Sequence, residues 1–211
     1  FRRVLFPILT PRPRATAQPF GGWKRSSVGG GAKPGGPGHL HGYGYWTDER
    51  PRPAHARDTF HAAWRDHFAV EHDPSGLKCE ANVLRFVPLD GVIVRFGRDT
   101  DSESLAIIRE AAMVSGVPVD RSDASVETDA ELAGRIGGIG AERIRVLGPV
   151  SDELLRACHR AGIAVDRAPV TSEGMVELQH WVREQSVSRT MHRYGRLVGH
   201  RQGRPSSGRP R

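Results

Sequence analysis

Cysteine and methionine are scarce in this sequence, and long apolar runs are absent. The 211 residues include only two cysteines and three methionines. The cysteines, Cys79 and Cys158, are too few and too far apart for a disulfide framework or a metal-binding pattern, which indicates a reducing, cytoplasmic environment. No apolar stretch approaches the ~20 residues that a membrane-spanning helix needs. The sequence therefore predicts a protein without disulfides and without a membrane partner.

Acidic residues are fewer than basic ones, and the imbalance is confined to the ends of the chain. The formal net charge is +7 and the isoelectric point is near 10.2. Residues 1–70 hold 11 lysines and arginines against 4 acidic residues, residues 71–182 hold 12 against 19, and residues 183–211 hold 8 against 1. Basic ends rich in glycine, proline and serine are typical of solvated tails. No nucleic-acid reader motif accompanies the charge, so nucleic acid is a disfavoured partner.

A regular alternation of strand and helix patterns begins at residue 91. Val92–Phe96 reads as a strand, Ser102–Ser115 as a helix ended by Gly116, and Ser151 as the N-cap of a further helix. Such alternation predicts a parallel sheet with helices on its faces. The expected fold class is therefore α/β, a small Rossmann-like parallel sheet with flanking helices, preceded by an irregular Gly/Pro-rich segment. Additional helices are expected over residues 59–71 and 175–185.

The turn after the first strand of this sheet lacks the glycines of a dinucleotide site. Residues 97–103 contain one glycine and three acidic residues, where a cofactor phosphate would have to sit. The glycine-rich residues 137–140 follow a helix pattern and precede a strand, which is the wrong end of the sheet for a phosphate site. We therefore expect this chain to bind no cofactor.

Glycine, proline and cationic side chains dominate residues 18–40. The run reads QPFGGWKRSSVGGGAKPGGPGHL. Its composition suits either a flexible linker or a loop that presents bare backbone N–H groups to a ligand. In the PFGGWK piece it resembles the C-terminal signature of the aldehyde dehydrogenase superfamily. In the AKPGGP piece it resembles, more narrowly, the L-glutamate γ-semialdehyde dehydrogenases, also called Δ1-pyrroline-5-carboxylate dehydrogenases.

Motifs farther along the chain resemble the C-terminal extension of large bacterial members of that family, which are often fused to proline dehydrogenase. They comprise residues 71–77 (EHDPSGL), 80–86 (EANVLRF), 183–190 (REQSVSRT) and 192–195 (HRYG), and the resemblance extends over residues 16–197. In the family the catalytic thiolate, the carboxylate base and the NAD site precede the glycine-rich signature. The resemblance thus implies that this chain is the C-terminal part of such an enzyme and is inactive alone. Its expected partners are the catalytic and NAD-binding parts of the same enzyme, with homo-oligomerisation left open.

The resemblance also assigns candidate site residues within the glycine-rich region. Gly35 and Gly36 match the loop that binds the substrate α-carboxylate through main-chain N–H groups. Two consecutive glycines suit this task because they leave no side chain between the backbone and the anion. Tyr43 matches an aromatic residue that packs on the aliphatic chain of the substrate; the alternative is ordinary packing with its aromatic neighbours. The remaining candidates match residues that shape the active-site cavity: Phe20, Gly21 and Gly22.

No residue of the chain is expected to be catalytic or to bind a metal. Cys79 lacks the flanking pattern of an aldehyde dehydrogenase thiol, and Cys158 is expected on the buried side of a helix. The histidines His39, His41 and His55 have no cysteine or carboxylate that would complete a metal site. Solvated histidines are the simpler interpretation.

These patterns divide the chain into four parts. Residues 1–47 are expected to end the catalytic and oligomerisation region, residues 48–90 to form a connector with a helix, residues 91–198 to form the non-catalytic Rossmann-like domain, and residues 199–211 to be a disordered basic tail. The expected function is that of the C-terminal region of an NAD-dependent dehydrogenase in proline catabolism. The alternatives are a stand-alone α/β scaffold or interaction module with basic tails and, less favoured, a nucleic-acid-associated protein.

Overall fold

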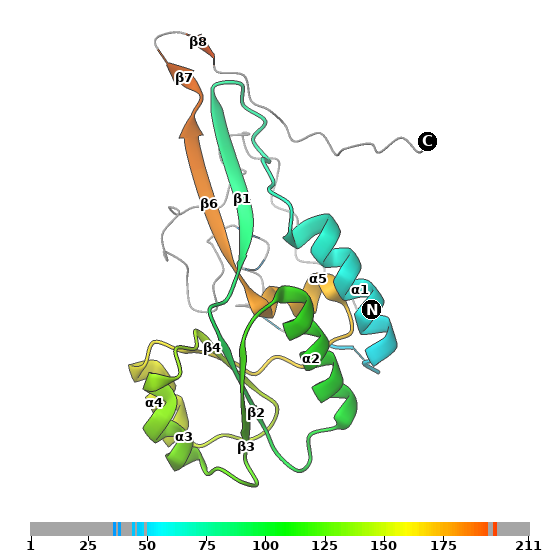
Figure 1. Ribbon diagram of the computed structural model, residues 1–211, viewed down its shortest axis with the longest axis vertical. Helices are drawn as coiled ribbons and strands as arrows, with labels where there is room; N and C mark the ends of the chain where they lie inside the picture. Colours follow the sequence, from blue (N-terminus) through cyan, green and yellow to red (C-terminus); the bar gives the residue numbers. More distant parts are fainter. Residues whose placement is uncertain are drawn as a thin grey trace.

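The computed structural model describes residues 36, 38, 44, 46–48, 50–193 and 196–197. A four-stranded parallel sheet lies at one end, and a two-stranded antiparallel ribbon projects away from it (Figure 1). A short hairpin of β7 (His192–Arg193) and β8 (Arg196–Leu197) lies at the far end of the ribbon. No helix in this described part of the chain is long and apolar enough to cross a membrane.

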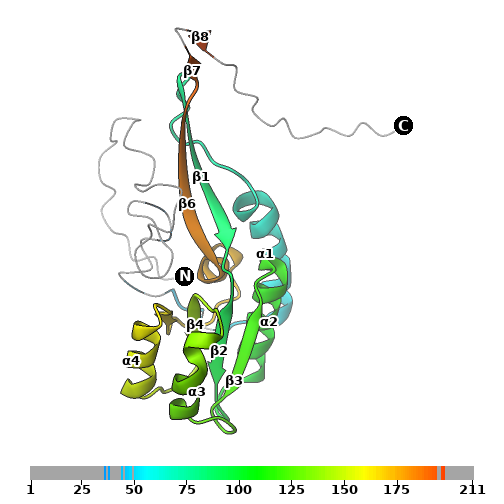
Figure 2. The ribbon, with the colours of Figure 1, turned by 60° about the vertical axis from the view of Figure 1, so that its left-hand side comes forward.

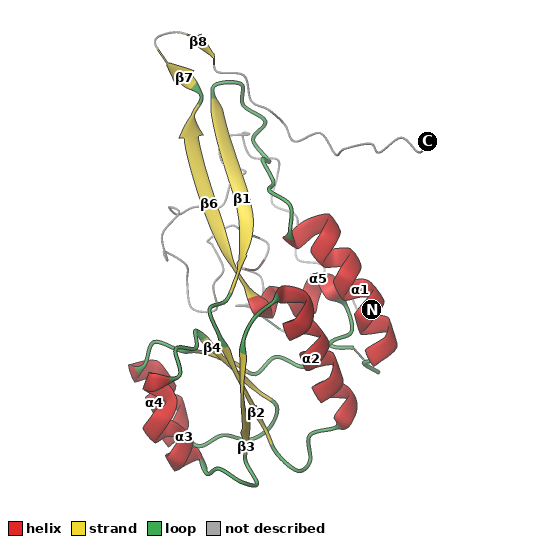
Figure 3. Cartoon of the chain, in the orientation of Figure 1, coloured by secondary structure: helices red, strands yellow, loops and turns green. Residues whose placement is uncertain are grey.

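The parallel sheet confirms the expected α/β fold class. Its strands run in the order β3-β2-β4-β5, and helices cover both of its faces (Figure 2). The four strands of the sheet are short (Figure 3), and β2 has the bounds that its apolar run predicts. The bounds are β2 (Val92–Phe96), β3 (Val119–Asp123), β4 (Arg143–Val146) and β5 (Ala164–Asp166).

Side chains of β2 alternate between the two faces of the sheet. Val92 and Val94 pack in one apolar cluster with helix α2 (Ser102–Ser115), whereas Ile93 packs in a second cluster with helices α3 (Asp129–Arg135) and α4 (Asp152–Arg160). Because both faces of β2 are covered, the strand is a continuous apolar run over its first three residues.

Capping residues define the ends of the helices in the sheet region. Asp101 accepts a hydrogen bond from the Ser104 N–H at 2.6 Å, and Gly116, with φ of 69°, ends α2 in the left-handed conformation. Thr128 and Glu131 form a capping box at α3, which a 3-10 turn, η4 (Ile136–Gly138), continues. Ser151 caps α4 as expected.

Helix α1 (Pro53–Ala63) begins six residues before the predicted start at residue 59. Proline in the first helical turn needs no N–H partner, so Pro53 favours a start there rather than preventing it. The helix continues as a π-helical turn, η3 (Trp64–Phe68), and the chain leaves helical geometry before the predicted end at residue 71.

The predicted helix over residues 175–185 is wrong in its second half. Helix α5 (Gly174–Glu177) and the 3-10 turn η5 (Leu178–Trp181) are followed directly by strand β6 (Val182–Thr190). Buried and partly exposed residues alternate along the first half of β6, which is the period of a strand. Strand β6 pairs antiparallel with β1 (Glu80–Pro88) along its whole length, and this pairing decides its conformation.

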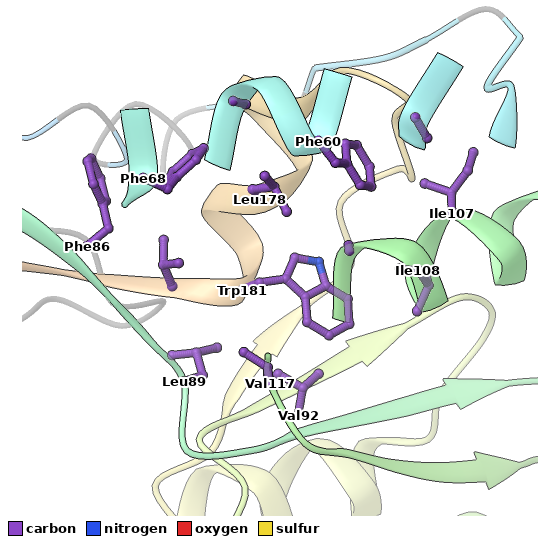
Figure 4. Close-up of a cluster of buried hydrophobic side chains, with 14 of the residues drawn as sticks. Phe60, Phe68, Phe86, Leu89, Val92, Ile107, Ile108, Val117, Leu178 and Trp181 are labelled. Carbon is purple, nitrogen blue, oxygen red and sulfur yellow. The ribbon is translucent and has the colours of Figure 1, made fainter. Parts of the chain in front are cut away.

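The main apolar core lies where the ribbon, α1, α2 and the sheet meet (Figure 4). Trp181 is fully buried at its centre, near Val92 of β2, Val117 just before β3, and Leu178 of η5. The core therefore fixes the base of β6 to the sheet. The ribbon pairs β1, from the expected connector, with β6, from the expected Rossmann-like domain, so it crosses the expected boundary at residue 90. The four-part division of the chain remains a prediction.

Candidate functional site

A buried glutamate on β6 contacts the glycine-rich segment. The Gly38 N–H donates a hydrogen bond to Oε1 of Glu184 at 2.6 Å. Glu184 is only 5% exposed, and the strand register places it opposite Phe86 of β1. A carboxylate thus approaches a backbone N–H in a site from which water is largely excluded, where such a charge-assisted bond is strong.

The neighbouring Gly36 is buried against the same carboxylate. A Cβ atom added at position 36 would lie 2.8 Å from Cδ of Glu184 and closer still to one of its oxygens. Real Cβ atoms do not approach other atoms so closely, so this position admits glycine and excludes a side chain unless Glu184 moves. The structure therefore brings one predicted carboxylate-binding glycine, Gly36, into contact with a carboxylate of the chain itself.

The other predicted site residues cannot be placed in the same way. They lie outside the described residues: Gly35, Tyr43, Phe20, Gly21 and Gly22. Glu184 carried no predicted role, although it stands in the REQSVSRT motif. The only sequence signal for it is that motif, because its contact with Gly38 joins residues 146 positions apart.

A buried cluster of charges lies below the base of β6. Arg145 of β4 donates from one terminal nitrogen to both carboxylate oxygens of Glu177, each at 3.0 Å. Its other terminal nitrogen donates to Oδ1 of Asp166 at 3.0 Å and to the Ala168 carbonyl at 2.9 Å. Arg145 is 1% exposed and Glu177 is fully buried, so this ion pair joins the sheet to α5 in a low-dielectric interior.

Asp166 lies against two basic side chains in this cluster, Arg145 and His180. Burial by itself would raise the pKa of its carboxyl, but the nearby charges of Arg145 and His180 outweigh burial and hold the pKa well below its usual value. His180 Nδ1 lies 2.7 Å from Oδ2 of Asp166. Glu177 also accepts from the Thr171 N–H at 3.0 Å and from the Trp181 indole N–H at 3.3 Å. The segment just before β6 is therefore anchored by the ion pair of Glu177 with Arg145 and by the burial of Trp181.

A cavity of ≈ 410 Å³ opens at the carboxyl ends of β2, β3 and β4, which is where doubly wound folds bind nucleotides. Several polar groups at this edge of the sheet are already engaged within the chain. The Gly97 N–H donates to the Thr100 hydroxyl at 3.0 Å, that hydroxyl donates to the Leu147 carbonyl at 3.1 Å, and Asp101 occupies the start of α2. A phosphate would meet the Asp101 carboxylate at the helix N-terminus. That no dinucleotide binds here stays a prediction, and the position of the Asp101 carboxylate is its physical reason.

Within the part of the chain that the structure describes, which leaves out His39 and His41, the thiols and histidines are not arranged for nucleophilic or metal chemistry. Cys158 is fully buried on α4, and burial raises the pKa of its thiol. Cys79 is exposed. His55 Nε2 lies 3.1 Å from a carboxylate oxygen of Glu173. Among the residues with a described placement, no group of three histidine, cysteine or carboxylate side chains could hold a metal ion.

Comparison with known proteins gives an informative similarity. No protein-family model and no curated protein matches the chain. The solved structure of proline utilization A from Corynebacterium freiburgense matches it with 32% sequence identity and a TM-score of 0.65. The match covers 86% of this chain and 20% of that protein, so the chain spans about a fifth of the length of the structure that it matches. In both sequence and fold, the chain is thus related to one segment of proline utilization A.

Proposed function

We propose that this chain is the C-terminal region of an NAD-dependent L-glutamate γ-semialdehyde dehydrogenase of proline catabolism, in the large form that also contains proline dehydrogenase. The observation that carries the proposal is the similarity to proline utilization A over 86% of the chain. The PFGGWK and AKPGGP motifs support it because they resemble the C-terminal signature of this dehydrogenase family.

In this proposal the chain contributes substrate binding and structural support. The glycine-rich loop binds the α-carboxylate of the semialdehyde through backbone N–H groups, which orients the aldehyde carbon toward the nucleophile. The Rossmann-like sheet and the ribbon hold that loop against the catalytic and NAD-binding parts of the same enzyme, which are its partners. When bound to those parts, NAD accepts the hydride that the aldehyde carbon loses.

The chemical step belongs to residues outside this chain. An aldehyde dehydrogenase requires a thiolate nucleophile, and the Cys158 thiol is buried with a raised pKa. Cys79 is exposed and lacks the family's flanking pattern. We therefore expect the 211-residue chain to be inactive alone.

The test compares the longer polypeptide with the chain. The natural reading frame should be followed upstream, and the complete polypeptide should be purified and assayed for NAD reduction with Δ1-pyrroline-5-carboxylate, which is in equilibrium with the semialdehyde. We expect turnover by the complete polypeptide and none by residues 1–211. An upstream frame without a cysteine nucleophile motif and a cofactor domain, or turnover by residues 1–211, would refute the proposal.

A further inference from the structure

We infer that Glu184 is a positioning residue for the glycine-rich loop: its carboxylate holds Gly36 and Gly38 in the conformation that presents backbone N–H groups to the carboxylate of the substrate. This inference rests on the function proposed above and extends it to a residue on a different element. Glu184 acts through the loop and has no contact with the reacting atoms.

Two independent contacts define the role. The Gly38 N–H donates to Oε1 of Glu184 at 2.6 Å, and Gly36 packs so closely on the carboxylate that a Cβ would lie 2.8 Å from Cδ. The first contact fixes the loop by a directional, charge-assisted bond. The second leaves no space for a side chain at position 36 unless the Glu184 carboxylate moves. Together they hold the chain at positions 36 and 38.

The loop needs such an anchor because of its composition. Glycine loses more conformational freedom on ordering than any other residue, and a substrate that must order the loop on binding loses affinity by that amount. Glu184 supplies the ordering before the substrate arrives. It can do so because β6 is held by its pairing with β1 and by the burial of Trp181 at its base.

The N–H group that Glu184 binds lies outside the glycine pair predicted to bind the substrate. Glu184 accepts from Gly38, two residues beyond the predicted Gly35–Gly36 pair. A carboxylate that instead competed with the substrate for the loop would reduce substrate affinity. The two roles predict opposite effects when the negative charge is removed, so a single substitution distinguishes them.

The first test uses the 211-residue chain and does not depend on activity. Amide exchange of Gly38 should be measured by NMR in the wild type, in Glu184→Gln and in Gln185→Ala. Gln185 is the matched control because it is next to Glu184 on β6 and its side chain is bonded to Arg85. We expect Gly38 to exchange about tenfold faster in Glu184→Gln, as for loss of one charge-assisted bond. Gly38 should be unchanged in Gln185→Ala. Equal exchange in all three proteins would overturn the inference.

The second test uses the complete polypeptide. In Glu184→Gln we expect the KM for the semialdehyde to rise about tenfold with little change in kcat, because the interaction with the carboxylate is made in both the ground state and the transition state. A short aliphatic aldehyde without a carboxylate should show unchanged kcat/KM. A lower KM for the semialdehyde, or an equal loss for both aldehydes, would contradict the positioning role.

A second variant covers the case in which Glu184→Gln disturbs the ribbon. Gly36→Ala pushes on the same contact from the loop side, and we expect the same selective rise in KM. A wild-type polypeptide that does not oxidise the semialdehyde would refute the proposed function, whereas the Gly38 exchange experiment would still decide whether Glu184 holds the loop.

Discussion

Replacing Arg145 with methionine removes the guanidinium that lies between two buried carboxylates. Arg145 is 1% exposed and binds both oxygens of Glu177 at 3.0 Å and Oδ1 of Asp166 at 3.0 Å. Methionine fills most of the volume and supplies no charge. The variant therefore leaves Glu177, which is fully buried, without its cation.

The expected cost follows from the burial of the groups that remain. Removing one partner of a buried ion pair typically lowers the unfolding free energy by about 3–5 kcal/mol, because the other charge stays desolvated. Glu177 keeps hydrogen bonds from the Thr171 N–H and the Trp181 indole, so we expect a loss near the lower end, about 3 kcal/mol. A domain of ordinary stability has about 5–15 kcal/mol in total, so Arg145→Met should remain folded but be strongly destabilised.

Urea unfolding followed by circular dichroism measures this loss. The matched control is Arg156→Met on α4. The Arg156 side chain is 71% exposed and lies 3.6 Å from Asp152 one helical turn away. Such an exposed pair contributes about 0.3–0.5 kcal/mol. If the two variants lost similar amounts of stability, the assignment of Arg145 to a buried, stabilising cluster would be wrong.

Asp166 provides a pH signature for the same variant. Its folded-state pKa lies below its unfolded value, so in the wild type its carboxylate contributes stability that is present above the unfolded pKa of about 3.9 and is lost as the pH falls through the folded pKa. Arg145 is the largest of the charges that lower this pKa. Without it the contribution shrinks, and the difference in stability between wild type and variant should narrow as the pH falls below the unfolded pKa, from about 4 toward about 2. A constant difference over that range would refute the assignment.

Two further predictions concern packing and thiol accessibility. Gly174→Ala should lower the unfolding free energy by about 1–3 kcal/mol or more, because a Cβ there would lie 2.7 Å from the Thr59 carbonyl carbon, a backbone atom. The control Gly134→Ala, at a helical position with open space, should raise it by about 0.5–1 kcal/mol; urea unfolding of both variants tests this, and equal effects would count against it. In native protein a thiol reagent should label Cys79, which is exposed, while Cys158, which is fully buried, should react only after unfolding. Mass spectrometry of the labelled peptides decides this, and rapid native labelling of Cys158 would contradict its placement.

Local signals predicted the sheet region well. The bounds of β2 and α2 follow from a continuous apolar run and from a helical pattern with Asp101 before it and Gly116 after it. These features depend on neighbours in sequence, so periodicity and capping residues are enough to define them.

Long-range pairing explains what the sequence did not show. In sequence, residues 182–185 look like the continuation of a helix. They form a strand because they pair with β1, about a hundred positions earlier. Arg143 and Arg145 suggest a half-exposed strand, yet both side chains are buried. Carboxylates from later segments neutralise Arg145 in the interior. The contact of Glu184 with Gly38 is of the same kind: neither residue type nor spacing predicts which distant carboxylate reaches the loop.

The pairing of Pro88 with Val182 makes the entire parallel sheet an insertion between two adjacent strands. Roughly 90 residues separate these partners, so bringing the strands together first would cost about 4 kcal/mol in loop-closure entropy before any strand contact is gained. We therefore expect the inserted sheet, whose strands are closer in sequence, to fold first and to bring the ends of β1 and β6 together. We expect the ribbon, and with it the glutamate that holds the glycine-rich loop, to form last.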